Sequence, residues 1–109
     1  MKRAKKGWRG YIFSRPILGS GVPQRVQNLV VRSYAQRHKL HFRLSAVEYH
    51  MDGCAMMLES LYAELGALEG LLFYSMHMLP ASPPVRRRLY DEVLKSRCGL
   101  RFALEEISI

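Results

Sequence analysis

The chain has 109 residues, of which 49% are hydrophobic, and it carries a formal net charge of +8. This length predicts one small domain, and the hydrophobic content argues against a disordered chain. No apolar run approaches the roughly 18 residues of a membrane-spanning helix. Two cysteines, Cys54 and Cys98, are too few for a disulfide scaffold or a metal site, so we expect free thiols, no metal and no other cofactor.

The charge is distributed unevenly along the chain. No Asp or Glu precedes Glu48, so residues 1–47 are purely basic and all nine acidic residues follow them. Such asymmetry indicates an anionic partner, although a soluble domain with a basic tail is equally compatible with it. The start, MKRAKKGWRG, is basic like a signal peptide, but Ser14, Arg15 and Pro16 interrupt the apolar run that follows, so we expect a cytoplasmic protein.

The first half of the chain predicts strand, helix and strand. Aromatic and β-branched residues predict a strand at 8–14. Apolar residues at helical spacing predict a helix at 22–39 with Pro23 in its first turn, and a second strand follows at 41–47. Two faces are expected on this helix: an apolar one with Val22, Val26, Leu29, Val30 and Tyr34, and a basic one with Arg25, Arg32, Gln36 and Lys39.

The middle of the chain predicts a second helix and a third strand. The helix is expected at 53–65, with Asp52 as its cap and Gly66 as its stop. The strand at 70–76 is the most hydrophobic, which places it in the interior of the sheet. The apolar side of the helix is expected to carry Met56, Met57, Leu58, Leu61, Tyr62 and Leu65, and Met76 and Met78 are also expected in the core.

The last part predicts a third helix and a fourth strand. Ser82 before Pro83 is a helix start, the helix is expected to run to about Arg97, and Cys98-Gly99 ends it before a strand at 100–104. The run Arg86-Arg87-Arg88 opposes the helix dipole near this start, which indicates an anion or an acidic neighbour, unless it is a solvated surface run. The residues expected to face inward are Val85, Leu89, Val93 and Leu94.

The order of elements, β-α-β-α-β-α-β, predicts the fold class. We expect residues 1–7 to form a flexible basic arm and residues 8–109 to form a single three-layer α/β domain. Its sheet would have four mostly parallel strands, right-handed crossovers and helices on both faces, as in resolvase-like and flavodoxin-like folds.

The carboxyl ends of parallel strands bind ligands in folds of this kind, and the starts of the helices at the same edge favour anions. This rule collects the candidate site. The expected ligand- and anion-binding residues are Ser14, Arg15, Gln24, Arg25 and Tyr49, and the expected catalytic residues are Glu48, His77 and Ser14. Arg15 and Arg25 would hold the anion, and Glu48 or His77 would move a proton.

Each of these candidates has a plainer reading. The glycines and proline of GYIFSRPILGSGVPQRVQN also suit a simple strand-to-helix connection, and the loop matches neither phosphate-binding motif. A nucleophilic Ser14 would need His50 or His77 as its base, and a serine bonded to the backbone of the turn is the favoured reading. Cys54 in a first helical turn would be reactive, but a small buried residue is favoured there.

Several stretches together resemble one family, namely GYIFSRPI, VPQRVQNLVVRSY, LSAVEY, MMLE, LLFYSMHMLP and FALE. They are similar to the sporadic carbohydrate cluster proteins, short bacterial proteins named for their place among genes for surface-polysaccharide and nucleotide-sugar synthesis. The similarity covers residues 7–106. It implies a role in polysaccharide (O-antigen, lipopolysaccharide or capsule) synthesis, and the family supplies no reaction.

From this resemblance we expect a protein that binds or modifies a sugar, a sugar phosphate or a nucleotide sugar at the carboxyl edge of the sheet. An enzyme and an auxiliary or regulatory partner of pathway enzymes both stay open, as does a homodimer. A purely structural, dimerising subunit is a third reading.

A fainter resemblance, of fold, is to the catalytic domain of serine recombinases (resolvases), whose first strand also ends near a Ser and an Arg. Phe13 and Arg15 stand where that family has an arginine and a serine, and MMLE and HMLP replace its later arginine motifs. Without those cations an active serine recombinase is not expected. The alternative function is therefore a nucleic-acid-binding module of this fold that uses the basic arm and the helical stripe Arg25, Arg32 and Lys39.

Overall fold

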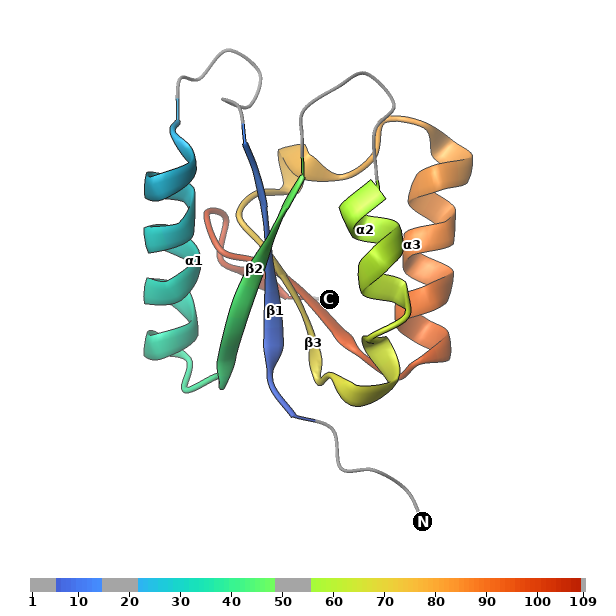
Figure 1. Ribbon diagram of the computed structural model, residues 1–109, viewed down its shortest axis with the longest axis horizontal. Coiled ribbons are helices and arrows are strands. Elements are labelled where there is room, and N and C mark those ends of the chain that lie inside the picture. Colours follow the sequence, from blue (N-terminus) through green and yellow to red (C-terminus); the bar gives the residue numbers. More distant parts are fainter. Residues whose placement is uncertain (1–5, 15–21, 49–55, 109) are drawn as a thin grey trace.

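The computed structural model describes residues 6–14, 22–48 and 56–108, and it is a mixed α/β structure (Figure 1). The candidate residues Arg15, Tyr49, His50 and Cys54 lie outside the described residues. The strands are β1 (Trp8–Phe13), β2 (Phe42–Glu48), β3 (Gly70–Phe73), β4 (Gly99–Phe102) and β5 (Ile107–Ser108); the α-helices are α1 (Gln24–Arg37), α2 (Met56–Tyr62) and α3 (Pro83–Lys95); and the 3₁₀ turns are η1 (Leu65–Ala67) and η2 (Met76–Met78).

The strands form one sheet in the order β2-β1-β3-β4-β5. The pairs β1–β2, β1–β3 and β3–β4 are parallel, and β5 is antiparallel to β4. In Figure 1, α1 lies on one side of the sheet and α2 and α3 lie on the other, as right-handed crossovers in this strand order require. The prediction of a mostly parallel α/β sheet is confirmed, but the sheet has five strands instead of four. Two residues of β5 are too few to give a periodic signal in the sequence.

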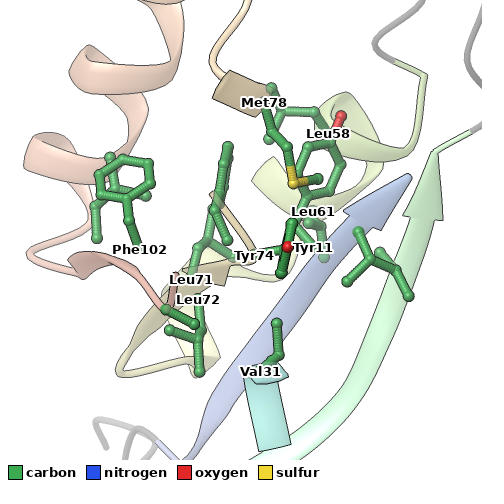
Figure 2. Close-up of a cluster of buried hydrophobic side chains, with 14 of the residues drawn as sticks. Tyr11, Val31, Leu58, Leu61, Leu71, Leu72, Tyr74, Met78 and Phe102 are labelled. Carbon is green, nitrogen blue, oxygen red and sulfur yellow. The ribbon is translucent and has the colours of Figure 1, made fainter. Parts of the chain in front are cut away.

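The core lies between the sheet and the helices, with β3 at its centre. All four residues of β3 are buried, which confirms the prediction that this strand is interior. Figure 2 shows Tyr11 of β1, Leu58 and Leu61 of α2 and Phe102 of β4 contributing to one buried cluster. The strand stops at Phe73 because Ser75 already caps the 3₁₀ turn η2, so the predicted strand at 70–76 was too long.

The buried face of α1 agrees with the predicted one in part, since Tyr34 is buried and Val22 and Val30 pack against the core. Val26 is 41% exposed and Leu29 is 59% exposed, so neither packs inward as expected. The residues that α1 buries are Gln27, Val31, Tyr34 and Ala35. The pattern of apolar residues predicts that the polar Gln27 faces the solvent. Because Gln27 is buried instead, the expected face is rotated by part of a turn from the observed one. The residues of the predicted basic face, Arg25, Arg32, Gln36 and Lys39, are all exposed, but Lys39 lies beyond the end of α1.

The other helices agree with the sequence in part. Leu89 and Val93 of α3 are buried as expected, whereas Val85 and Leu94 are exposed. In α2, Leu58 and Leu61 are buried, but Met56 at its start is 71% exposed. The remaining expected core residues divide likewise: Met78 and Leu65 are buried, Met57 and Tyr62 are partly buried, and Met76 is exposed.

Two helices end in a left-handed residue that is not glycine. Lys39 after α1 has φ 55° and Arg97 after α3 has φ 58°. At the end of α1, the amides of Lys39 and Leu40 donate to the carbonyls of Gln36 and Ala35, and α3 ends in the same pattern. This Schellman arrangement favours glycine at the left-handed position. The glycines predicted to stop helices do other things: Gly66 lies within η1, and Gly99 begins β4.

We therefore expect Lys39→Gly and Arg97→Gly each to stabilise the fold by about 0.5–1 kcal/mol. Left-handed backbone costs an L-residue about 1–2 kcal/mol, and glycine avoids this cost. Part of the gain in stability is lost again, because glycine raises the conformational entropy of the unfolded chain. Urea denaturation of each variant measures the change. Gln36→Gly, at an exposed position inside α1, is the control and should lose about 1 kcal/mol. A loss of stability in both left-handed variants would contradict the prediction.

Candidate functional site

The carboxyl ends of β1 to β4 share one edge of the sheet, because these four strands are parallel. The chain passes from β1 to β2 on one side and later returns to β3 on the other side of β1. The strand order therefore reverses between β1 and β3, and open α/β sheets bind ligands in the crevice at such a point. Ser14 directly follows β1, Glu48 ends β2, and Ser75 follows β3 after one residue.

Glu48 is 1% exposed and is bound on several sides. Its Oε1 accepts a hydrogen bond of 2.7 Å from the Tyr11 hydroxyl. The backbone amides of Met57 and Leu58 donate to the same carboxylate at 3.1 and 3.2 Å. A carboxylate in this place satisfies the unpaired N–H groups at the start of α2 and the positive end of its dipole. The structure gives Glu48 a structural role, and its role as a general base stays a prediction.

Gln27 joins α1 to the end of β1. Its side-chain oxygen accepts from the amide of Phe13 at 2.9 Å, and its side-chain nitrogen donates to the carbonyls of Phe13 and Val22, each at 3.1 Å. The side chain thus completes the backbone hydrogen bonding of β1 where the strand ends. It ties the end of β1 to the start of α1.

Ser14 and His77 do not form a catalytic pair among the described residues. The amide of Ser14 donates to the carbonyl of Glu48 at 2.9 Å, and its side chain is half-buried. His77 is exposed on η2, where its amide donates to the Ser75 hydroxyl at 3.1 Å. The imidazole of His77 is available to a ligand at this edge, but no hydrogen bond connects it to Ser14 or Glu48.

Glu105 fixes the turn that follows β3. Its two carboxylate oxygens accept from the Ser75 hydroxyl at 2.7 Å and from the Met76 amide at 3.0 Å. Burial raises the pKa of the neighbouring Tyr74 phenol, and the negative charge of Glu105 raises it further. Glu105 therefore has a structural role in this turn.

The helix starts at this edge differ in what they can offer an anion. The protein's own carboxylates already occupy the start of α2 (Glu48) and that of η2 (Glu105). α3 begins with Pro83 and Pro84, which have no N–H to donate. α1 has neither a side-chain cap nor an acidic residue in its first turn, where Gln24 and Arg25 are exposed. Of the described helix starts, that of α1 is the one best able to receive an external anion.

The arginine run at the start of α3 has a structural explanation. Arg88 forms an ion pair with Glu59 of α2 at 3.0 Å, and its guanidinium lies 5.1 Å from the centre of the Tyr62 ring. Burial raises the pKa of Tyr62 to about 12, although Arg88 itself lowers it. Arg86 donates to the carbonyl of Pro80. The acidic neighbour that the run indicated is therefore Glu59, and Arg87 is exposed.

Gln27 and Glu105 were not among the predicted site residues, although their side chains hold the chain at the ends of β1 and β3. A polar residue in the middle of an otherwise apolar helix face is a signal that could have identified Gln27. Within residues 6–14, 22–48 and 56–108, no group of three or more His, Cys, Asp or Glu side chains is placed to hold a metal.

Comparisons of the chain with protein-family models, with curated proteins and with solved structures find no match. In the part of the chain that the structure describes, no helix is both long enough and apolar enough to span a membrane.

Proposed function

We propose that the protein binds a sugar phosphate or a nucleotide sugar at the carboxyl edge of the sheet, with the phosphate at the start of α1. The observation that carries this proposal is the uncapped first turn of α1 at the edge of the sheet where the strand order reverses between β1 and β3. Backbone N–H groups and the helix dipole favour an anion there, and the exposed Arg25 adds a full positive charge. The geometry thus supports the phosphate part of the proposed ligand.

The sugar part of the proposal comes from the resemblance to the sporadic carbohydrate cluster proteins. In this proposal the protein acts in the cytoplasm beside enzymes of surface-polysaccharide synthesis, and binding is its role. The enclosed Glu48 carboxylate favours binding over catalysis, because a substrate could reach it only if the start of α2 opened. The proposal also assigns the domain to the three-layer flavodoxin-like or resolvase-like folds. Ligands of flavodoxin-like folds bind where the strand order reverses between β1 and β3.

A thermal-shift screen with sugar phosphates and nucleotide sugars, at low and moderate salt, tests the proposal. A ligand that binds the native state raises the melting temperature through mass action. For the ligand that gives the largest shift, we expect Arg25→Ala to weaken binding about tenfold, as loss of a charge-assisted contact implies. Gln24→Pro removes one N–H donor at a position where a helix tolerates proline, and it should weaken binding without loss of fold.

Arg87→Ala is the matched control, because it removes the same charge from an exposed position at the start of α3. Equal affinity of the wild type, Arg25→Ala and Gln24→Pro would rule out the start of α1 as the binding site. A shift with a DNA duplex alone, lost on adding salt, would favour the alternative nucleic-acid-binding function, which the exposed stripe Arg25, Arg32 and Lys39 supports.

A further inference from the structure

α1 and the edge strand β2 lie side by side at one end of the sheet (Figure 1). Between them is a groove of about 490 Å³, within the size range of ligand-binding pockets. It is lined by Asn28 and Arg32 of α1 and by His41, Phe42, Arg43, Leu44 and Ser45. Its lining from β2 is the amino-terminal half of that strand, so the groove is separate from the carboxyl edge of the sheet.

The lining of the groove includes two arginines and no Asp or Glu. Arg32 belongs to α1 and Arg43 to β2, both are exposed, and neither forms an ion pair with a described residue. The Oδ1 atom of Asn28 accepts from the Ser45 hydroxyl at 2.8 Å, so the amide nitrogen of Asn28 keeps its two hydrogens for another acceptor. Guanidinium groups, an amide and the His41 imidazole make a set of donors suited to phosphate oxygens.

The edge of β2 is unsuited to receive another strand. The register passes from Arg9↔Arg43 to Gly10↔Ser45, which leaves Leu44 as a bulge. The carbonyl of Leu44 is held by Arg9 Nε at 2.6 Å, and its side chain is 80% exposed. Bulges and charged side chains are devices that prevent strand addition at an edge. An extended peptide is thus disfavoured, and a second copy of the chain would bring the same positive charges to the groove.

We propose that this groove binds single-stranded nucleic acid. A groove with a basic lining tracks a phosphate backbone, and adjacent apolar surface receives the bases. Phe42, which is partly buried, and the exposed Leu44 supply that surface in the lining of the groove. The cations line a hollow, which suits a flexible single strand better than a rigid duplex. This site does not depend on the start of α1 or on the sugar-phosphate proposal.

The fluorescence anisotropy of a labelled oligothymidylate of twelve nucleotides, measured over a range of salt concentrations, tests binding to the groove. We expect the double variant R32A/R43A to bind at least about tenfold more weakly than the wild type. Its slope of log K against log salt concentration should be smaller by about 1.4, that is, by two phosphate contacts on a single strand. The control R87A/K95A removes two exposed charges from α3, on the other side of the sheet, and should bind as the wild type does.

Three outcomes would overturn the proposal. Equal weakening in the groove variant and the control would show that net charge alone attracts the oligonucleotide. Equal binding of an abasic oligonucleotide of the same length would show that the bases make no contact. Displacement of the oligonucleotide by polyglutamate of equal charge and at equal concentration would identify an acidic peptide as the better occupant. Thermal melts check that both double variants fold. We expect both to fold, because all four substituted residues are exposed.

Discussion

Glu48→Ala is expected to lower the free energy of unfolding by at least about 3 kcal/mol, because it leaves several buried donors without an acceptor. The donors are the Tyr11 hydroxyl and the amides of Met57 and Leu58, and the side chain that serves them is 1% exposed. The substitution also leaves a cavity beside the start of α2, which adds to the loss. Urea denaturation followed by circular dichroism measures the change.

Two milder variants separate the contributions. Tyr11→Phe keeps the carboxylate and removes one hydroxyl, and we expect it to lose about 1–2 kcal/mol. Glu48→Gln keeps the shape of the side chain and one acceptor oxygen, so its loss should lie between those of the other two variants. If Glu48→Ala unfolds at the urea concentration of the wild type, the structural role of Glu48 is wrong.

The order of strands and helices was predictable because each depends on neighbours in the sequence. Aromatic and β-branched residues mark β1, the most hydrophobic run marks β3, and Ser82-Pro83 marks the start of α3. A strand as short as β5 gives no such signal, since its place is decided by pairing with β4. Mostly parallel topology then followed from the alternation of elements and the handedness of crossovers.

The edge of the sheet at which the candidate site lies was predictable, but the interactions of its residues were not. The carboxyl edge follows from the topology, and Glu48 was correctly placed at the end of a strand. That its carboxylate serves Tyr11 and the start of α2 depends on contacts 37 and 9–10 residues away along the chain, which no local pattern encodes. Gln27 is likewise predicted to face the solvent, because the sequence does not show that its side chain bonds to the backbone of Phe13.

The Trp8 ring explains two glycines of the sheet, Gly70 and Gly99, because it leaves no room for a side chain at either position. On the face of the sheet that α1 covers in part, the Trp8 ring lies across β3 and β4 and is 7% exposed. The guanidinium of Arg101 lies 5.0 Å above the ring and donates to the Tyr34 hydroxyl at 3.3 Å. The indole therefore fills a place between these glycines and Arg101, and the strands beneath it have room for hydrogen atoms only.

We expect Gly99→Ala to destabilise the protein by about 3 kcal/mol, as forced overpacking does in a dense interior. A Cβ atom at Gly99 would lie 2.5 Å from Trp8 Cη2, closer than real contacts allow. Gly70→Ala should lose more, because its Cβ would meet both Trp8 Cζ3 and, at 2.5 Å, the backbone carbonyl of Gly99. Gly66→Ala is the control: nothing lies within 4 Å of its Cβ position, so no loss is expected.

A double-mutant cycle with Trp8→Phe distinguishes a clash with the ring from a clash with the backbone. The phenyl ring lacks the outer indole atoms Cζ3 and Cη2, so in this background Gly99→Ala should lose less than about 1 kcal/mol. Gly70→Ala should keep most of its loss there, because the carbonyl of Gly99 is unchanged. Chemical denaturation of the six proteins of the two cycles gives both coupling energies. Equal costs of Gly99→Ala in the two backgrounds would mean that Trp8 does not explain this glycine.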